Sequence, residues 1–125
     1  MRLPRRLSMT RREEFAAVRK RGESLATRNF VMATLPHSHS GLIKFGLITS
    51  RRAARRAVDR NRIRRHLRAI LINHGDKLES GRYLVMVARR KAGEASFQEL
   101  EADWLRLARR LGILQEDQPM EQNPD

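Results

Sequence analysis

The sequence predicts a single α+β domain, a two-layer sandwich in which a small sheet of about four strands carries its helices on one side. Apolar runs of strand length alternate with longer segments whose apolar residues recur at helical spacing, in the order helix, strand, strand, helix, strand, helix. The 125 residues suffice for one domain with a modest core. We expect this domain to span residues 1–114, beginning with an extended basic arm over residues 1–8. Residues 115–125 hold two prolines and no apolar periodicity, which predicts a disordered acidic tail.

The first predicted helix starts at Thr10, whose spacing to Glu13 is that of a capping box, and it ends near Arg21. In a capping box, a hydroxyl and a carboxylate satisfy the free amides of the first turn. Phe15 and Val18 provide the apolar face of this short helix.

Three segments have the length and apolar content of strands: residues 29–35, 42–49 and 82–88. The third is apolar on both faces, which places it centrally in the sheet. A short extra strand fits at residues 23–26. The turn after the first of the three holds His37 and His39, which we interpret as solvated loop residues because no third metal ligand lies nearby.

The segment between the second and third of these strands is the most unusual in the chain. Nine of the residues from Arg51 to Arg68 are arginine, and Asp59 alone is acidic. A buried helical stripe follows from the spacing of the apolar residues Ile63, Leu67, Ile70 and Leu71. The opposite face of that helix would carry Asn61, Arg64, Arg65 and Arg68.

A structured arginine surface points to phosphate as its ligand. The guanidinium group is planar, always charged, and donates hydrogen bonds in a fork that fits two oxygens. The alternative is a solvated surface helix, but such helices usually mix charges of both signs, and this face is almost free of acids. Nucleic acid is therefore the favoured partner.

The last helix is predicted from a second capping box, Ser96 to Glu99. Its apolar stripe consists of Phe97, Leu100, Trp104, Leu107, Ala108 and Leu111. Because Trp104 lies on this stripe, we interpret it as a core residue in preference to a base-stacking one.

Composition narrows the function further. The net charge is +13, and the 27 basic and ten acidic residues before Gln115 give that part +17, which favours a polyanionic partner. The chain has no cysteine, hence no disulfide or thiolate metal site, which fits a cytoplasmic protein. No apolar run is long enough to span a membrane, and no signal peptide is recognisable. We find no carboxylate cluster or histidine pair for protein-based phosphodiester hydrolysis, so we assign no catalytic and no metal-binding residue.

The motif Gly46 to Arg52, followed by Arg56 to Arg68 with its Arg-Asn-Arg core at residues 60–62, resembles the protein components of bacterial ribonuclease P. The resemblance extends over roughly Leu3 to Leu114. It implies a left-handed βαβ crossover, in a fold also found in a ribosomal protein domain. It further implies an RNA-binding subunit whose partners are the catalytic RNA and precursor tRNA, with no obligate protein partner. The RNA would carry out removal of the 5′ leader and hold most of the magnesium ions.

The resemblance also assigns residues to two surfaces. Those that would face the catalytic RNA are Arg51, Arg52, Arg56, Arg60, Asn61, Arg62, Arg64, Arg65 and Arg68. Those that would form a leader-binding cleft between the first helix and the sheet are Phe15, Arg19, Val31, Ala33 and Arg89. The family often has aromatic residues where this chain has Arg19 and Ala33, which implies a more electrostatic grip on the leader.

Two other functions are compatible with a basic α+β domain. One is a structural RNA-binding protein of the ribosomal type. The other is a DNA-binding regulator that places the basic helix in a major groove. The latter would need a neighbouring positioning helix, whereas strands flank the basic helix on both sides.

Overall fold

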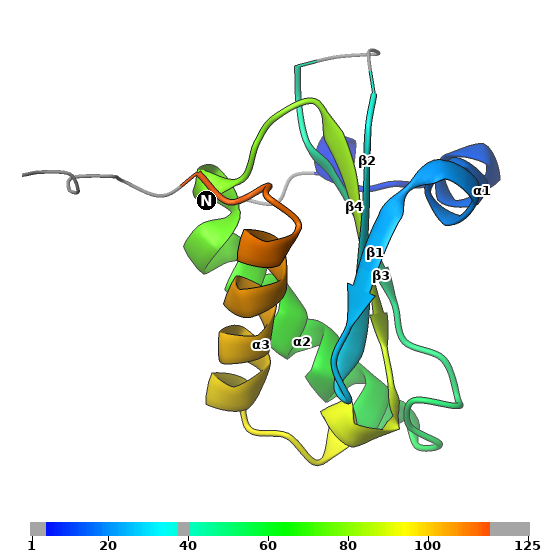
Figure 1. The fold of residues 1–125 in the computed structure, drawn as a ribbon. Coiled ribbons are helices and arrows are strands. Elements are labelled where there is room, and N and C mark those ends of the chain that lie inside the picture. Colours follow the sequence, from blue (N-terminus) through cyan, green and yellow to red (C-terminus); the bar gives the residue numbers. More distant parts are fainter. Residues whose placement is uncertain (1–4, 38–40, 116–125) are drawn as a thin grey trace, which may run out of the picture.

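The computed structural model describes residues 5–37 and 41–115. These residues form one mixed four-stranded sheet with helices on both of its faces (Figure 1). The strands are β1 (Glu23–Ala26), β2 (Phe30–Pro36), β3 (Lys44–Ile48) and β4 (Arg82–Ala88). The helices are α1 (Arg12–Arg21), α2 (Ala57–His74) and α3 (Phe97–Arg110), with short 3-10 turns η1 (Arg5–Leu7), η2 (Gly75–Lys77) and η3 (Arg90–Gly93).

The strand order is β1-β2-β4-β3, so β4 is central, as its apolar sequence predicts. β2 pairs antiparallel with β1 and β4, and β3 pairs parallel with β4. Helix α2 joins the two parallel strands in the predicted βαβ unit. The left-handed crossover of this unit stays a prediction. The registers place the ends of β1, β3 and β4 and the start of β2 at one end of the sheet.

The main core lies between the sheet and the pair α2 and α3. The predicted stripe of α2 is confirmed, since Ile63, Leu67, Ile70 and Leu71 are all buried. On α3, Trp104 is fully buried and its indole N–H lies 3.1 Å from the sulfur of Met86 on β4. Burial of these two stripes fixes α2 against the sheet and leaves its other side to solvent.

The α+β class and the four strands are confirmed, but the helices do not all lie on one side. Helices α2 and α3 cover one face, whereas α1 covers part of the opposite face (Figure 1). There Val18 packs with Tyr83 and Val85, while Leu84 and Met86 point to the main core. The reason is the alternation of side chains along β4, which is apolar on both faces and needs cover on both.

The N-terminal segment is docked where the sequence suggested an extended arm. Leu7 is buried, and Ser8 forms a bridge with Phe45 of β3. The backbone N–H of Met9 donates to the carbonyl of Phe45 at 2.7 Å. The first four residues of the expected arm lie outside the described residues. An apolar leucine within the basic run explains the docking, because its burial ties the segment to the core.

Helix α1 begins one residue later than its sequence suggested. Glu14, and not Glu13, caps it, accepting hydrogen bonds at 3.1 Å from the backbone N–H groups of Thr10 and Arg11. The Glu14 carboxylate also pairs with Lys44 Nζ at 3.1 Å, which links α1 to β3. Because the residue after Glu13 can reach a cation on the sheet, the box shifts by one position.

Protonation of Glu14 at acidic pH should lower the free energy of unfolding. Burial raises the pKa of this carboxyl, but the hydrogen bonds from Arg11, Lys44 and Thr10 outweigh burial and hold the pKa below its usual 4.5. The stabilisation is therefore complete above pH 4.5 and is lost as the pH falls through the lower pKa of the folded state. We expect the free energy of unfolding to exceed that of Glu14→Gln at pH 7, and the difference to shrink below pH 4.5. Urea unfolding at both pH values measures this; a constant difference would contradict it.

The C-terminal part largely follows the prediction. The capping box is confirmed, with Ser96 Oγ accepting from the N–H of Glu99 at 3.1 Å. Gly112, at φ 74°, terminates the helix in a left-handed conformation that suits glycine. The backbone N–H of Gln115 donates to the carbonyl of Lys77, so the body extends to residue 115. The rest of the expected tail, residues 116–125, lies outside the described residues.

Within residues 5–37 and 41–115, we find no helix long and apolar enough to cross a membrane.

His37, expected to be solvated, is half-buried, with its ring 4.5 Å from that of Tyr83. Tyr83 lies beside this ring because the register of β2 and β4 pairs Tyr83 with Leu35, and the backbone N–H of His37 donates to the carbonyl of Gly81 at 2.8 Å. His39 lies outside the described residues.

Candidate nucleic-acid interface

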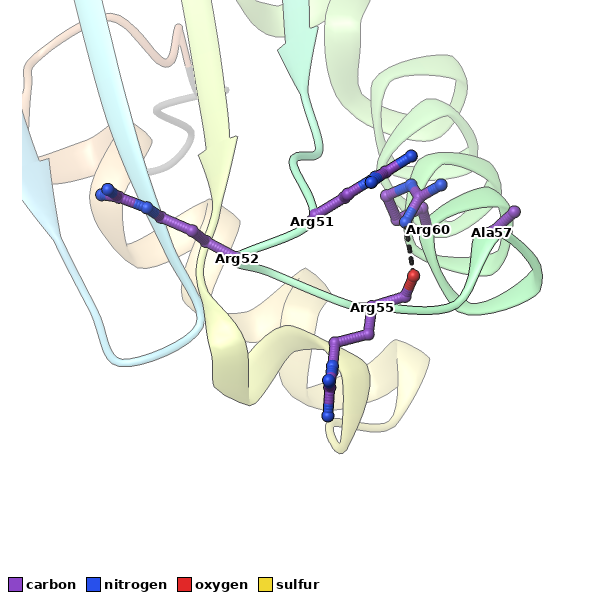
Figure 2. A pocket seen from close by; sticks show the side chains of 5 residues that line it. All are labelled: Arg51, Arg52, Arg55, Ala57 and Arg60. Carbon is purple, nitrogen blue, oxygen red and sulfur yellow. Dashed lines mark hydrogen bonds between the residues drawn. The ribbon is translucent and has the colours of Figure 1, made fainter.

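The arginine-rich stretch folds as a loop followed by a helix. Residues 51–56 form the loop after β3, and α2 begins at Ala57. Figure 2 shows that the loop arginines diverge: Arg51 points toward Arg60 on α2, Arg52 points to the opposite side, and Arg55 points away from both. The stretch therefore presents cations in several directions around the N-terminal end of α2.

The solvent side of α2 carries the predicted polar residues. Asn61, Arg65 and Arg68 are exposed and Arg64 is half-buried, with its guanidinium donating to Asn61 Oδ1 at 2.9 Å. The side chains of Arg65 and Arg68 form no hydrogen bond or ion pair with any described residue. The same holds for Arg51 and Arg52 of the loop, and Arg56 is exposed beside them. These cations are consequently available to an external anion.

Arg60 has a different environment. Its Nη1 donates to the backbone carbonyl of Arg55 at 2.8 Å (Figure 2) and to that of Ala54 at 3.0 Å. Both acceptors belong to the loop before α2, so the side chain ties that loop to the first turns of the helix. Arg60 thereby holds the loop arginines in place.

Arg62 fastens a second loop. Its Nη2 donates to the carbonyl of Gly93 at 2.6 Å and lies 3.7 Å from a carboxylate oxygen of Asp59. Gly93 closes η3, which follows β4 and carries Arg90. Two residues of the Arg-Asn-Arg motif thus hold two loops, the one before α2 and the one after β4.

Hollows on this surface are lined mainly by arginine. One, of about 550 Å³, is bounded by Ala57 and the guanidinium-bearing residues Arg51, Arg52, Arg55 and Arg60 (Figure 2). An adjacent hollow adds Arg90, together with the acids Asp59 and Glu94. Arg55 and Arg90 were not among the predicted site residues. They could have been found in the sequence from their positions, because each lies in the segment that follows a predicted strand.

The predicted cleft residues lie mostly on the sheet face that α1 partly covers. Phe15 and Ala33 pack there with Val87, and Val31 is paired with Val87 in the register of β2 and β4. Val31, Ala33 and Val87 are only half-buried. This part of the sheet is therefore an apolar surface within reach of solvent.

The two charged cleft residues are both exposed. Arg19 lies on α1, and Arg89 lies at the end of β4, where its guanidinium donates to the carbonyl of Thr27 at 3.1 Å. Arg89 thus joins β4 to the β1–β2 turn, while Arg19 makes no described hydrogen bond.

Phe15 links the apolar face to the arginine helix. Its ring lies over Gly46 of β3, where an added Cβ would come within 2.6 Å of the ring. Phe15, Gly46, Arg64 and Arg68 line one hollow of about 230 Å³. The two surfaces assigned separately from the sequence are therefore contiguous, and glycine at position 46 gives the ring its place.

His66 of α2 is half-buried, with its ring 5.6 Å from that of Phe97. Burial lowers the pKa of His66, as do the nearby charges of Arg62 and Arg65. Among residues 5–37 and 41–115, we find no group of three or more histidines and acids that could hold a metal ion.

The chain is similar in sequence to known proteins over most of its length. A family model described as Ribonuclease P matches residues 3–112. The ribonuclease P protein component of Bacillus pumilus (strain SAFR-032) is 32% identical over 114 residues, which cover 91% of this chain and 95% of the relative. The ribonuclease P protein component of Desulfovibrio desulfuricans is 38% identical over 112 residues, which cover 87% of this chain and 85% of the relative.

Solved structures agree with this result at the level of the fold. The RNase P protein of Staphylococcus aureus aligns with a TM-score of 0.79 at 20% identity, covering 86% of this chain and 97% of that one. The protein from Thermotoga maritima aligns with a TM-score of 0.72 at 23% identity, covering 82% and 96%.

Proposed function

The chain belongs to the ribonuclease P protein family, and from this premise we propose how its surfaces divide the work of a protein subunit. It is the RNA-binding subunit of a ribonucleoprotein endoribonuclease that processes tRNA. In our proposal, the exposed arginines of α2 and of the preceding loop bind the phosphates of the catalytic RNA, and the sheet face beside α1 receives the 5′ leader of precursor tRNA.

The observation that carries this proposal is the set of exposed arginines without a described partner. Arg51, Arg52, Arg65 and Arg68 are held on a helix and loop that are themselves anchored by burial and by Arg60. Because the backbone that carries these arginines is ordered before binding, only their side chains lose conformational freedom when they bind phosphate. Such a surface suits a folded RNA, whose phosphates are also fixed in space.

The leader would lie on the neighbouring apolar face. Val31, Ala33 and Val87 offer a floor for bases, Phe15 offers an aromatic ring, and Arg89 stands at the rim. The side chains at positions 19 and 33 give no second aromatic ring, so backbone phosphates should contribute more to leader binding than stacking does.

The chemistry would belong to the RNA. When they are bound, magnesium ions activate water and stabilise the negative charge that develops during hydrolysis. In our proposal, the RNA holds most of these ions. The protein residues contribute by binding and orienting the substrate. We expect the assembled enzyme to work in the cytoplasm and to need no second protein.

Single-turnover cleavage of a precursor tRNA at low magnesium tests the proposal. Cleavage is measured in three samples: a bacterial ribonuclease P RNA alone, the same RNA together with this protein, and this protein alone. Correct 5′ cleavage only when both components are present is the expected result. Cleavage by the protein alone would contradict an RNA-based reaction, and tight RNA binding without any gain in cleavage would favour a structural RNA-binding role.

Arg60 should act on RNA binding through the loop that it holds. Arg60→Ala is expected to lower affinity for the RNA, because Arg51, Arg52 and Arg55 lose their fixed positions. In a chain in which those three are already glutamine, the same substitution should have a much smaller effect, a coupling of about 1 kcal/mol or more. A double-mutant cycle of RNA affinities measures it. Additive losses would instead mean that Arg60 contacts phosphate independently.

A further inference from the structure

We propose that the groove between the β1–β2 turn and α3 is a second phosphate-binding surface for RNA, with Arg28, Arg106 and Arg110 as its cations. The groove has a volume of about 580 Å³. It lies on the β1 side of the sheet, whereas α2 follows β3 at the other edge. This inference rests on the proposed function, because it assumes an RNA partner.

The groove has a built-in anchor. Asp103 is buried on α3 and accepts a hydrogen bond at 2.7 Å from Nδ2 of the buried Asn29. Its other oxygen lies 3.3 Å from Nη1 of Arg106. The carboxylate thus fixes both the turn and one guanidinium, so Arg106 is held at the groove while most of its side chain stays exposed.

The acids in the groove are already engaged. Asp103 is satisfied by Asn29 and Arg106, and Glu99 accepts from the backbone N–H of Ser96 at 3.0 Å in the cap of α3. Arg28 and Arg110 are exposed, and their side chains form no hydrogen bond or ion pair with a described residue. Two free guanidinium groups and one anchored group therefore face the same hollow.

The groove and the proposed RNA surface both reach the same end of the sheet. The β1–β2 turn, the end of β4 and the end of β3 share one end of the sheet. Arg28 lies in that turn, Arg89 directly follows β4, and Arg51 and Arg52 follow β3. In order across that end stand Arg28, Arg89 and the pair Arg51 and Arg52. Arg89 donates to the carbonyl of Thr27 and so joins the first two groups. An RNA backbone bound at α2 could follow this band around to α3.

The test compares three double variants of the full chain, each of which removes two positive charges. Arg28→Gln with Arg110→Gln changes the groove. Arg65→Gln with Arg68→Gln changes the α2 surface and serves as a reference. Arg12→Gln with Lys20→Gln, on exposed positions of α1, is the control. Thermal unfolding verifies that all three fold, and none of these side chains makes a described hydrogen bond.

Two affinities are measured as a function of salt: that of the protein for ribonuclease P RNA, and that of the assembled holoenzyme for precursor tRNA. We expect the groove variant to lower the salt slope of one of them by about two units and to weaken that affinity roughly 10- to 60-fold at 0.1 M salt. The affinity that changes identifies which RNA supplies the phosphates. The control should change neither slope.

A groove variant that matches the control in both measurements overturns this inference. If the α2 reference still weakens RNA binding in that case, the proposed function stands and only the groove is lost. If the reference also has no effect, the proposed function fails as well.

Discussion

Replacing Arg51, Arg52, Arg65 and Arg68 together by glutamine is expected to weaken binding of the catalytic RNA roughly a thousandfold at 0.1 M salt. Each phosphate contact contributes about one unit to the slope of log affinity against log salt, so the slope should fall by about four units. Equilibrium binding at several salt concentrations measures both quantities. The four side chains are exposed and make no described intramolecular bond, so the fold should be unaffected.

The choice of positions matters for this experiment. Substituting Arg60 and Arg62 would also weaken binding, but these side chains donate to backbone carbonyls of Ala54, Arg55 and Gly93, and their loss would disturb two loops. Glutamine at the four exposed positions removes charge without removing such a bond. An unchanged slope in this variant would contradict phosphate binding by the α2 surface, whatever its affinity.

The position of the arginine helix in the fold could be predicted from the sequence because its two faces differ so strongly. Apolar residues at the spacing of Ile63, Leu67, Ile70 and Leu71 have only one way to be buried together, and the arginines then face solvent. The central place of β4 could be predicted for a similar reason, since a strand that is apolar on both faces needs cover on both. Local patterns of this kind are decided by burial alone.

The side of the sheet that α1 occupies was not predictable by the same reasoning. Phe15 and Val18 mark a face of α1, but nothing in their spacing says which face of the sheet it meets. That choice depends on contacts distant in sequence, such as the pair Glu14 and Lys44 and the place that Gly46 leaves for the ring of Phe15. Long-range contacts of a few side chains leave no periodic signal.

The division of labour within the arginine motif was also hidden. In the sequence, Arg60 and Arg62 look like Arg65 and Arg68, because charge and residue type are the same. The structure separates them by their hydrogen-bond acceptors. The side chains of Arg60 and Arg62 donate to backbone carbonyls of neighbouring loops, whereas those of Arg65 and Arg68 have no acceptor among the described residues. The residues of one motif can therefore identify a family while each of them contributes to the interface in a different way.

Trp104 gives the second large effect, on stability. Trp104→Ala should lower the free energy of unfolding by about 3–5 kcal/mol, because a fully buried indole is replaced by a cavity between α3 and the sheet. The contacts that would be lost are the one between its N–H and the sulfur of Met86 and the stacking on His74 of α2, 5.9 Å away. Urea unfolding measures the loss, and a change below about 1 kcal/mol would contradict a core role.

Trp104→Phe is the matched variant that separates packing from RNA recognition. Phenylalanine keeps an aromatic ring in the core, so this variant should lose less stability than Trp104→Ala and remain folded. Its affinity for the RNA should equal that of the unmodified chain, because a side chain with no exposed surface cannot stack on a base. Weakened RNA binding by a folded Trp104→Phe chain would show that α3 opens when RNA binds, and it would move Trp104 from the core to the interface.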